Sequence, residues 1–276
     1  MWLLAALGTT VCFGINNTIF KWGTTKGLSK VSIQFFFYVV AFAVILSYSI
    51  VQEKLHFSLA AGLFGVIAGI LNANGNIQMS KAFEKGPGGI TSTLIAMNAI
   101  IPVLASGLVF PEPIAPLHWV GVILMISSAV IVQYQPSRSN AIEYRVWIFR
   151  ILLALLSIGS VGFVMKLATI AGFSYTDLLV SFYGGGLCYL AVFMMKEEVR
   201  KTEMKVGSMV GLLSVVGFGC YLFALQSGPA SVIFPVISLN CLVVMGLSLL
   251  LFHERLKSYQ LVGVLVAVCG LVLTKI

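Results

Sequence analysis

Long apolar runs follow one another along the chain, and short polar breaks separate them. The breaks carry charge, glycine or proline, as in "TTKGLSK", "EKGPG" and "KEEVRKTEMK". Apolar stretches of about 18 or more residues are typical of membrane-spanning helices. The pattern predicts ten such helices, over residues 2–21, 31–51, 58–82, 87–110, 116–134, 145–166, 175–195, 206–226, 229–251 and 258–275. We therefore expect an all-α polytopic membrane protein with almost no soluble part.

Composition supports this prediction and speaks against several soluble classes. The chain is 59% hydrophobic and 9% charged, which leaves too little polar surface to cover a soluble globule. A net charge of +8 would point to nucleic acid in a soluble protein, but here the basic residues are spread over the breaks, where they anchor helices at a membrane surface. We expect the lipid bilayer and no nucleic acid as a partner, in a bacterial inner (plasma) membrane.

The cysteines and the first apolar run narrow the chemistry further. All five cysteines lie inside predicted spans, without the paired short spacing of a metal site or a disulfide framework. They are interpreted as small packing residues, so we expect no metal and no cofactor. The first run has no basic segment before it, and we expect a mature span rather than a signal peptide. A monomer and a homodimer both stay open.

An internal repeat divides the chain into two halves. Residues 86–132 align with 228–274 without a gap at a constant offset of 142. A similar offset of 145 relates the first helices of the two halves. The first offset pairs Asn98 with Asn240 and Glu112 with Glu254; the second pairs Gly14 with Gly159 and Lys21 with Lys166. We predict a five-helix repeat in 1–135, a connecting loop in 136–144 and a second five-helix repeat in 145–276.

Because five is odd, the second repeat must enter the membrane from the side opposite to the first. The basic residues agree with this inversion: all but Lys54, Lys166 and Lys275 lie in or beside the loops that follow helices 1, 3, 5, 7 and 9. Inverted repeats are a common construction of transporters. The positive-inside rule then places both termini outside.

Three motifs carry a resemblance to a known family. They are "FGINN" with Lys21 in the first helix, the Gly-Pro that opens the fourth helix of each half, and "FHERLKSYQLVGVLVAVCGLVL" at 252–273. With these the chain resembles the drug/metabolite transporter superfamily, in particular its ten-helix EamA-type members, over essentially its whole length. The first half departs from the last motif, since it keeps Glu112 without a basic partner. The proline usual in the middle of the fourth helix is absent at Ala99 and Cys241. The resemblance implies cytoplasmic termini, against the charge distribution, so orientation stays open.

Polar side chains inside a span are costly in hydrocarbon and are candidates for a functional site. The densest group lies in the third helix, in "LNANGNIQMSK". Asn72 and Asn76 share one helix face, and Asn74 and Gln78 share another. Amides both donate and accept hydrogen bonds, which suits a polar, uncharged or zwitterionic solute. We predict that they line a polar cavity; the alternative is that they join neighbouring helices.

Amides also occur in the first helix and in the fourth helix of each half. Asn16 and Asn17 point about 100° apart, so one can face a cavity while the other bonds a neighbouring helix. Asn98 and Asn240 occupy equivalent positions, which fits either a central site between the repeats or a bridge between helices. We predict that Asn17 contacts the solute.

Two lysines and two tyrosines complete the candidate binding residues. Lys21 and Lys166 are interpreted first as side chains that extend to the membrane interface; the alternative is that one attracts a carboxylate or phosphate of the substrate. Tyr183 and Tyr221 are candidates for amphipathic cavity walls.

Together these features predict a carrier. A proton-coupled exporter of cationic drugs needs a buried carboxylate, and the sequence places no Asp or Glu deep in a span. We expect an alternating-access transporter of a small polar metabolite, an amino acid or a related compound, with a cavity between helices 1, 3, 4, 6, 8 and 9. The alternatives are an exchanger of phosphorylated or nucleotide-linked metabolites, a channel, an intramembrane enzyme and a membrane scaffold. An enzyme is not expected, because the chain lacks paired catalytic motifs.

Overall fold

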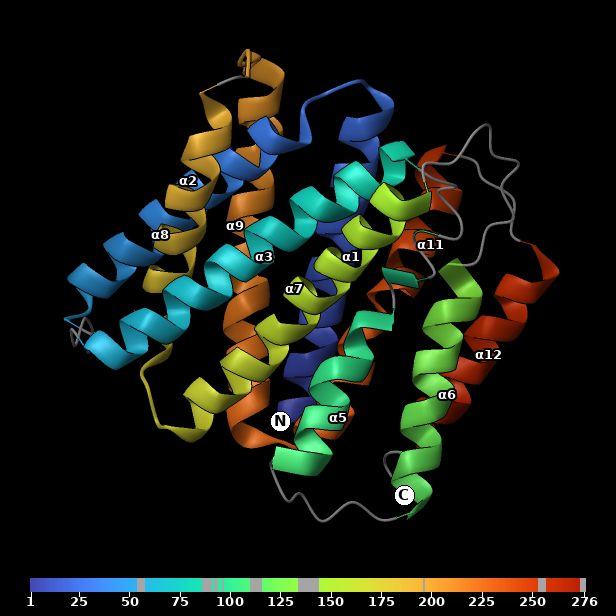
Figure 1. Ribbon diagram of the computed structural model, residues 1–276. Helices are drawn as coiled ribbons and strands as arrows, with labels where there is room; N and C mark the ends of the chain where they lie inside the picture. Colours follow the sequence, from blue (N-terminus) through green and yellow to red (C-terminus); the bar gives the residue numbers. More distant parts are fainter. Residues whose placement is uncertain are drawn as a thin grey trace.

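A computed structural model describes residues 1–53, 58–85, 91, 94–95, 97–109, 116–133, 144–195, 197–252 and 257–273. All regular structure in these ranges is helical (Figure 1). Before residue 136 the elements are α1 (Trp2–Thr25), α2 (Lys30–Val51), α3 (Leu59–Lys85), η1 (Met97–Ala99), α5 (Ile100–Val109) and α6 (Pro116–Gln133). After residue 143 they are α7 (Tyr144–Ile170), α8 (Tyr175–Met194), α9 (Lys201–Ser227), α10 (Ala230–Ser238), α11 (Asn240–Phe252) and α12 (Ser258–Leu273).

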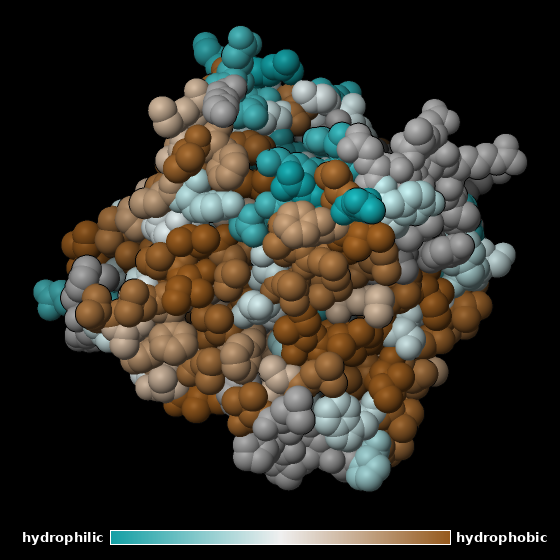
Figure 2. Space-filling view, viewed as in Figure 1, coloured by the Kyte–Doolittle hydropathy of each residue, from teal (hydrophilic) through white to brown (hydrophobic). Residues whose placement is uncertain are grey.

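Within the described ranges, seven helical segments are long and apolar enough to cross a membrane: α1, α2, α3, α7, α8, α9 and the pair α10–α11. Two shorter apolar segments, Trp119–Val132 and Ser258–Leu273, lie in α6 and α12. Large apolar side chains cover the middle of the molecule, while hydrophilic residues gather at the upper edge of the view (Figure 2). A helix satisfies its own backbone hydrogen bonds and can therefore lie in hydrocarbon. An all-helical structure with an apolar outer surface fits that environment.

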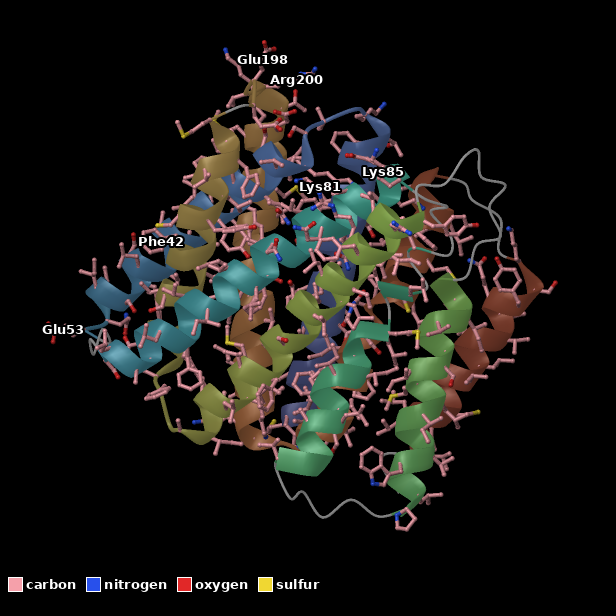
Figure 3. All side chains as sticks on the ribbon, in the orientation of Figure 1. Phe42, Glu53, Lys81, Lys85, Glu198 and Arg200 are labelled. Carbon is pink, nitrogen blue, oxygen red and sulfur yellow. The ribbon has the colours of Figure 1, made fainter. Side chains whose placement is uncertain are left out.

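The two ends of the helical bundle differ in charge. One end, which we call the basic end, carries Lys26, Lys30, Lys81, Lys85 and Arg200 at the ends of α1, α3 and α8 and the starts of α2 and α9 (Figure 3). Here the backbone N–H of Ser29 donates to the buried Glu203 carboxylate at 2.8 Å. The same carboxylate accepts a hydrogen bond from the backbone N–H of Arg200 at 3.1 Å, so it joins the starts of α2 and α9. The other end, where α1 and α8 begin and α9 finishes, is called the opposite end.

Most helix packing joins one half of the chain to the other. In the first half, α1 packs on α9, α10 and α11, while α3 packs on α7 and α8. The same pattern returns with the halves exchanged: α7 packs on α3 and α5, and α9 packs on α1 and α2. The pairs α2–α8 and α6–α12 each join equivalent helices. The halves therefore interlock, and their helices are related by a pseudo-two-fold arrangement.

Close glycine contacts fix the register of this arrangement. A Cβ on Gly211 of α9 would lie 2.7 Å from the carbonyl oxygen of Phe37 in α2. Gly69 of α3 stands 142 positions earlier, and a Cβ there would collide with the carbonyl of Phe182, which stands 145 positions after Phe37. The two sequence offsets thus hold in space. Small residues let helix backbones approach closely where lipid provides no hydrophobic drive for association.

The structure corrects the predicted helices 87–110 and 229–251, which are each interrupted. A short 3₁₀ segment, η1, precedes α5, and a turn at Leu239 separates α10 from α11. An asparagine lies at each interruption. Because an asparagine amide competes with the helical backbone for hydrogen bonds, Asn98 and Asn240 favour a break at positions where the apolar pattern alone predicts a continuous helix.

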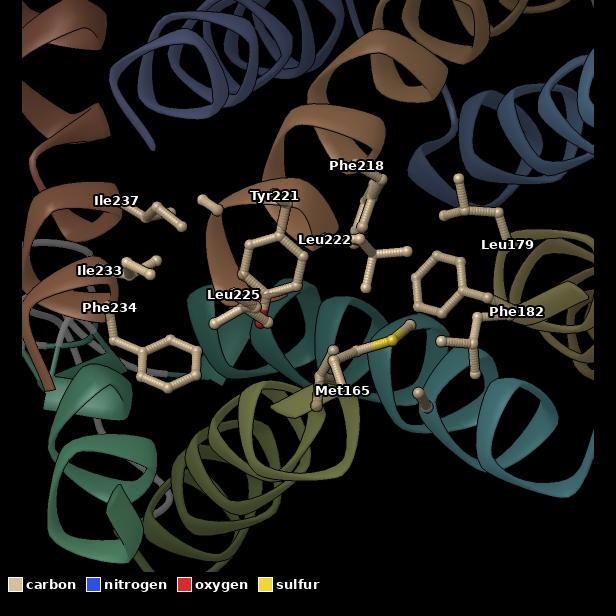
Figure 4. Close-up of a cluster of buried hydrophobic side chains, with 14 of the residues drawn as sticks. Met165, Leu179, Phe182, Phe218, Tyr221, Leu222, Leu225, Ile233, Phe234 and Ile237 are labelled. Carbon is tan, nitrogen blue, oxygen red and sulfur yellow. The ribbon is translucent and has the colours of Figure 1, made fainter. Parts of the chain in front are cut away.

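The largest hydrophobic core among the described residues runs through the bundle, and Figure 4 shows the part of it that α7, α8, α9 and α10 contribute. Phe182 and Phe218 stand with ring centroids 4.7 Å apart, and Tyr183 lies 6.1 Å from Phe218. Tyr38 and Tyr183, which are equivalent in the two halves, are both fully buried, with ring centroids 5.9 Å apart. The pseudo-symmetry axis of the bundle thus runs close to aromatic side chains.

The glycine contacts generate a stability prediction. We expect Gly211→Ala to lower the free energy of unfolding by about 1–3 kcal/mol, because the new methyl group overlaps a backbone carbonyl that has no room to move. Gly219 lies on the same helix, and a Cβ there meets no atom within 4 Å. Gly219→Ala should be neutral or stabilising by up to about 1 kcal/mol, from helix propensity alone. Thermal unfolding in detergent measures both; equal melting temperatures would contradict the register.

Candidate functional site

Two interrupted helices meet the first helix of the other half. The Asn98 Nδ2 donates to the Ile95 carbonyl at 2.7 Å, and the Asn240 Nδ2 donates to the Ile237 carbonyl at 2.9 Å. These two bonds are equivalent at the offset of 142. Each asparagine therefore donates a hydrogen bond to a carbonyl that the interrupted helix leaves without a backbone partner. Gly14 of α1 faces one break, because a Cβ there would lie 3.0 Å from the backbone carbonyl oxygen of Asn240.

The second half repeats this approach. A Cβ on Gly159 of α7 would lie 2.9 Å from the backbone carbonyl oxygen of Asn98. In both halves a helix backbone therefore runs directly against the break of the other half. Discontinuous helices at a repeat interface are where transporters place substrate sites, because the free ends expose polar backbone groups.

Asn17 lies beside the break in α10–α11. Its Nδ2 donates to the Asn240 Oδ1 at 3.2 Å. Thr10 and Lys21 lie on the same stripe of α1, and donate to the Val236 carbonyl at 3.1 Å and to the Ser248 hydroxyl at 3.0 Å. This stripe faces α10 and α11, yet the Asn17 side chain is exposed. The Asn17 side chain is therefore accessible from outside the helix packing beside the break.

Asn16 has a different environment. It is buried, and its Nδ2 donates to the Ser214 hydroxyl of α9 at 2.7 Å. Its Oδ1 has no partner among the described residues, and neither does the buried Tyr183 hydroxyl. In the first half, the equivalent Tyr38 hydroxyl accepts a hydrogen bond from Asn72 at 2.7 Å. Ser214 occupies the position equivalent to Asn72, and its shorter side chain leaves Tyr183 without that amide.

A hydrogen-bonded network joins α3 to α7 and α8. Asn74 donates to the Ser157 hydroxyl at 2.9 Å and accepts from Gln78 and from the Tyr189 hydroxyl, each at 2.9 Å. Gln78 accepts from the Arg150 guanidinium at 2.6 Å. The network brings a cation to the amides of α3. Sequence reasoning counted Arg150 with the loop charges; its position inside a long apolar helix was the signal that it lies in the span.

Asn76 points elsewhere, into a cleft of about 170 Å³ between α2 and α3 at the basic end. The amides of α3 thus fall into three surroundings: Asn72 beside Tyr38, Asn74 with Gln78 in the network, and Asn76 in the cleft. Asn72 and Asn74 thus bond side chains of neighbouring helices, and the lining of a substrate cavity by the α3 amides stays a prediction.

Lys166 and Tyr221 lie in the interior. Lys166 is 7% exposed, and its ammonium donates to the Leu225 carbonyl at 2.9 Å and to the Gly228 carbonyl at 3.2 Å. The buried ammonium therefore caps the negative end of α9. Tyr221 packs in the core, 5.9 Å from the ring of Phe218. Of the predicted site residues, the structure joins Asn17 directly to Asn240, and the others are distributed along the helices.

The family model for the EamA-like transporter family matches residues 1–134 and 145–276. The chain belongs to this family. It is therefore a member of the drug/metabolite transporter superfamily and an integral, multi-pass membrane protein. A solved crystal structure is similar over 99% of this chain and 98% of its own, with a TM-score of 0.83 and 11% identity, which shows a shared fold.

An uncharacterised protein of Methanocaldococcus jannaschii is 26% identical over 102 residues, which are 36% of this chain and 74% of that protein. Among the described residues, no group of three or more His, Cys, Asp or Glu is placed to hold a metal ion.

The contrasting exposure of two adjacent asparagines is testable. In a variant whose native cysteines are replaced by alanine, we expect Asn17→Cys to react with a charged thiol reagent in nanodiscs, because water reaches the space beside the helix break. Asn16→Cys should stay unreactive because its position is buried, and Leu4→Cys should stay unreactive because lipid covers it. Mass spectrometry of the labelled protein measures all three. Equal reactivity at positions 16 and 17 would contradict the assignment.

Proposed function

We propose that this EamA-like transporter carries a small polar metabolite, an amino acid or a related compound, by alternating access through a path between the two repeats. We further propose that the repeats are residues 1–135 and 145–276, joined by 136–144, and that the chain crosses the membrane ten times. Membership of a transporter family favours transport over an enzyme or a scaffold. Interlocked, pseudo-symmetric halves are suited to rocking about a central site.

One observation carries the proposal: equivalent positions at the two ends of the bundle have opposite character. At the basic end, the start of α2 and the end of α3 are polar, with Lys30, Gln34, Asn76, Ser80 and Glu84. At the opposite end, the equivalent positions at the start of α8 and the end of α9 are uncharged and mostly apolar, with Tyr175, Leu179, Phe218, Leu222 and Gln226.

The opposite end is sealed. Leu222 is fully buried, and Leu179 and Phe218 are 3% and 7% exposed (Figure 4). At the start of α8, the Tyr175 hydroxyl donates to the Gln226 side-chain oxygen, and this bond joins the start of α8 to the end of α9. At the basic end, the equivalent residues Lys30 and Glu84 interact electrostatically across the cleft. These contrasts support a path that is open at the basic end and closed at the other.

Alternating access then exchanges these two conditions. The close contacts of α9 with α2 and of α3 with α8 link the two ends mechanically, because each joins a helix of one gate to a helix of the other. Opening the Tyr175–Gln226 end while closing the cleft would present Asn17 and Asn240 to the opposite side.

Arg150 favours a second candidate, an exchanger of phosphorylated or nucleotide-linked metabolites. Its guanidinium bonds the Gln78 amide and has further N–H groups that match phosphate oxygens. Counterflow in liposomes separates the two candidates: phosphorylated solutes would drive exchange under the second one, and neutral amino acids would not.

The transport proposal is tested by flux. In liposomes that contain the purified protein, uptake of a radiolabelled mixture of neutral amino acids and related polar metabolites should be saturable. Asn17→Leu should lower the rate about tenfold or more, because it removes the amide beside the helix break at a cost of about 1–3 kcal/mol to a polar solute. Ser208→Leu, on α9 away from the path, is the control. A monodisperse Asn17→Leu protein with normal flux would rule out this part of the site.

The gate is tested separately. Tyr175→Phe removes one hydrogen bond, worth about 1 kcal/mol, so the population open at the opposite end should rise about fivefold. Leu222→Cys, in the cysteine-free background, reports this opening, because its side chain is buried when the gate is closed. We expect its labelling by a charged thiol reagent in nanodiscs to accelerate about fivefold with Tyr175→Phe and to stay constant with Tyr48→Phe. An unchanged rate with Tyr175→Phe would contradict the gate.

A further inference from the structure

We propose that the cleft between α2 and α3 is a binding site for a zwitterion, a solute with a separate ammonium group and a separate carboxylate or phosphate. The inference deepens the proposed function, on which it rests only for the idea that a transported solute enters through this cleft. Binding at the cleft is a property of its own and is tested apart from transport.

The cleft has the size of a small-solute site. Its volume of about 170 Å³ is below the roughly 300–1,000 Å³ of pockets that enclose a drug-sized ligand. Helix α2 forms one wall, α3 forms the other, and Glu197 approaches from the segment after α8. A solute of few heavy atoms fits this space, and a nucleotide does not.

The charges of the cleft balance. Lys30 and Lys81 contribute two ammonium groups, and Glu84 and Glu197 contribute two carboxylates. A solute with a single charge would find one complementary pair and one repulsive pair, whereas a zwitterion can place each of its charges against the opposite sign. Charge-assisted hydrogen bonds of this kind are among the strongest that a site can offer.

The floor of the cleft is polar as well. Gln34 lies one turn inward from Lys30, and Asn76 lies two turns inward from Glu84. Gln34 is 5% exposed and Asn76 is half-buried, and both line the cleft. Within the described part of the chain, neither amide makes a hydrogen bond to another residue. Buried amides normally have partners, so these two groups are available to a ligand.

The fold does not require these polar residues. The positions equivalent to Gln34 and Asn76 in the other half are Leu179 and Phe218, which are packed in the core (Figure 4). Lys81 corresponds to Phe223 at the offset of 142. The same helix pair therefore packs well with apolar side chains, and polar groups at the basic end have another role. A membrane protein that keeps polar groups inside its span uses them for function by default.

Two sources supply this chemistry: a free zwitterionic metabolite, such as a neutral amino acid, or the headgroup of a zwitterionic phospholipid, which carries an ammonium and a phosphate. The experiment separates them by lipid composition. The full chain is placed in nanodiscs of phosphatidylglycerol, which has no ammonium group, and equilibrium binding of a radiolabelled mixture of glycine, L-serine, L-leucine and L-phenylalanine is measured.

Two matched pairs of variants test the cleft itself. Lys81 and Glu197 line the cleft, whereas Lys85 and Glu198 stand close by without lining it (Figure 3). We expect Lys81→Gln and Glu197→Gln to weaken binding about tenfold, through loss of a charge-assisted hydrogen bond. Lys85→Gln and Glu198→Gln make the same changes of net charge and should bind as the wild type does. N-acetyl derivatives and methyl esters, each with one charge, should not compete.

A second arm detects the lipid source. In nanodiscs that contain phosphatidylethanolamine, native mass spectrometry measures the lipid that stays bound. Retention of this lipid by the wild type and its loss in the Lys81 and Glu197 variants would support the site with a headgroup as occupant. Absence of both kinds of binding, equal effects within each matched pair, or full competition by singly charged analogues would overturn the proposal.

The outcomes also separate this site from transport. Normal flux in the Lys81→Gln and Glu197→Gln variants, together with absent zwitterion binding, would remove the cleft and leave the transport function standing. Zwitterion binding that depends on the cleft residues, without any flux, would support the site and contradict the proposed transport function.

Discussion

The close approach of helix backbones from opposite halves of the chain is the constraint on which the rest of the structure depends. In hydrocarbon, lipid tails solvate apolar side chains as well as another helix does, so helices associate through tight packing and polar contacts. Here Gly69 and Gly211 bring α3 onto α8 and α9 onto α2, and Gly14 and Gly159 bring α1 and α7 onto the helix breaks. Neither half forms this core by itself.

This frame is pseudo-symmetric, but the side chains on it are not. Asn98 and Asn240 make equivalent bonds to their own helices, and Asn240 also accepts a hydrogen bond from the exposed Asn17 of α1. Tyr38 bonds an amide, and the hydroxyl of Tyr183 lies buried without one. If the two ends exchange their conditions, as the proposed function requires, their unlike linings would give the two conformations different energies. Such a pair is what a carrier needs to favour one side at rest and still reach the other.

Much of the frame could be predicted from the sequence. The spacing of apolar runs indicated the helices, and the repeat offsets read from glycine and asparagine hold in space. The breaks at Asn98 and Asn240 were not predicted, because the apolar pattern does not show where a side chain hydrogen-bonds a backbone carbonyl and interrupts the helix. The burial of Lys166 was missed because its helix extends to Ile170, beyond the predicted end at residue 166, and its ammonium bonds carbonyls at the end of α9.

The sequence by itself determined that the chain is helical, apolar, repeated and of a transporter family, because composition, period and internal alignment are local or linear properties. Only the tertiary structure decided which polar groups meet. It split the amides of α3 among a tyrosine, an arginine network and a cleft, and it set Gln34 opposite Asn76. Those pairings depend on helix rotation and on contacts between halves, which are set by the packing of residues more than 100 positions apart.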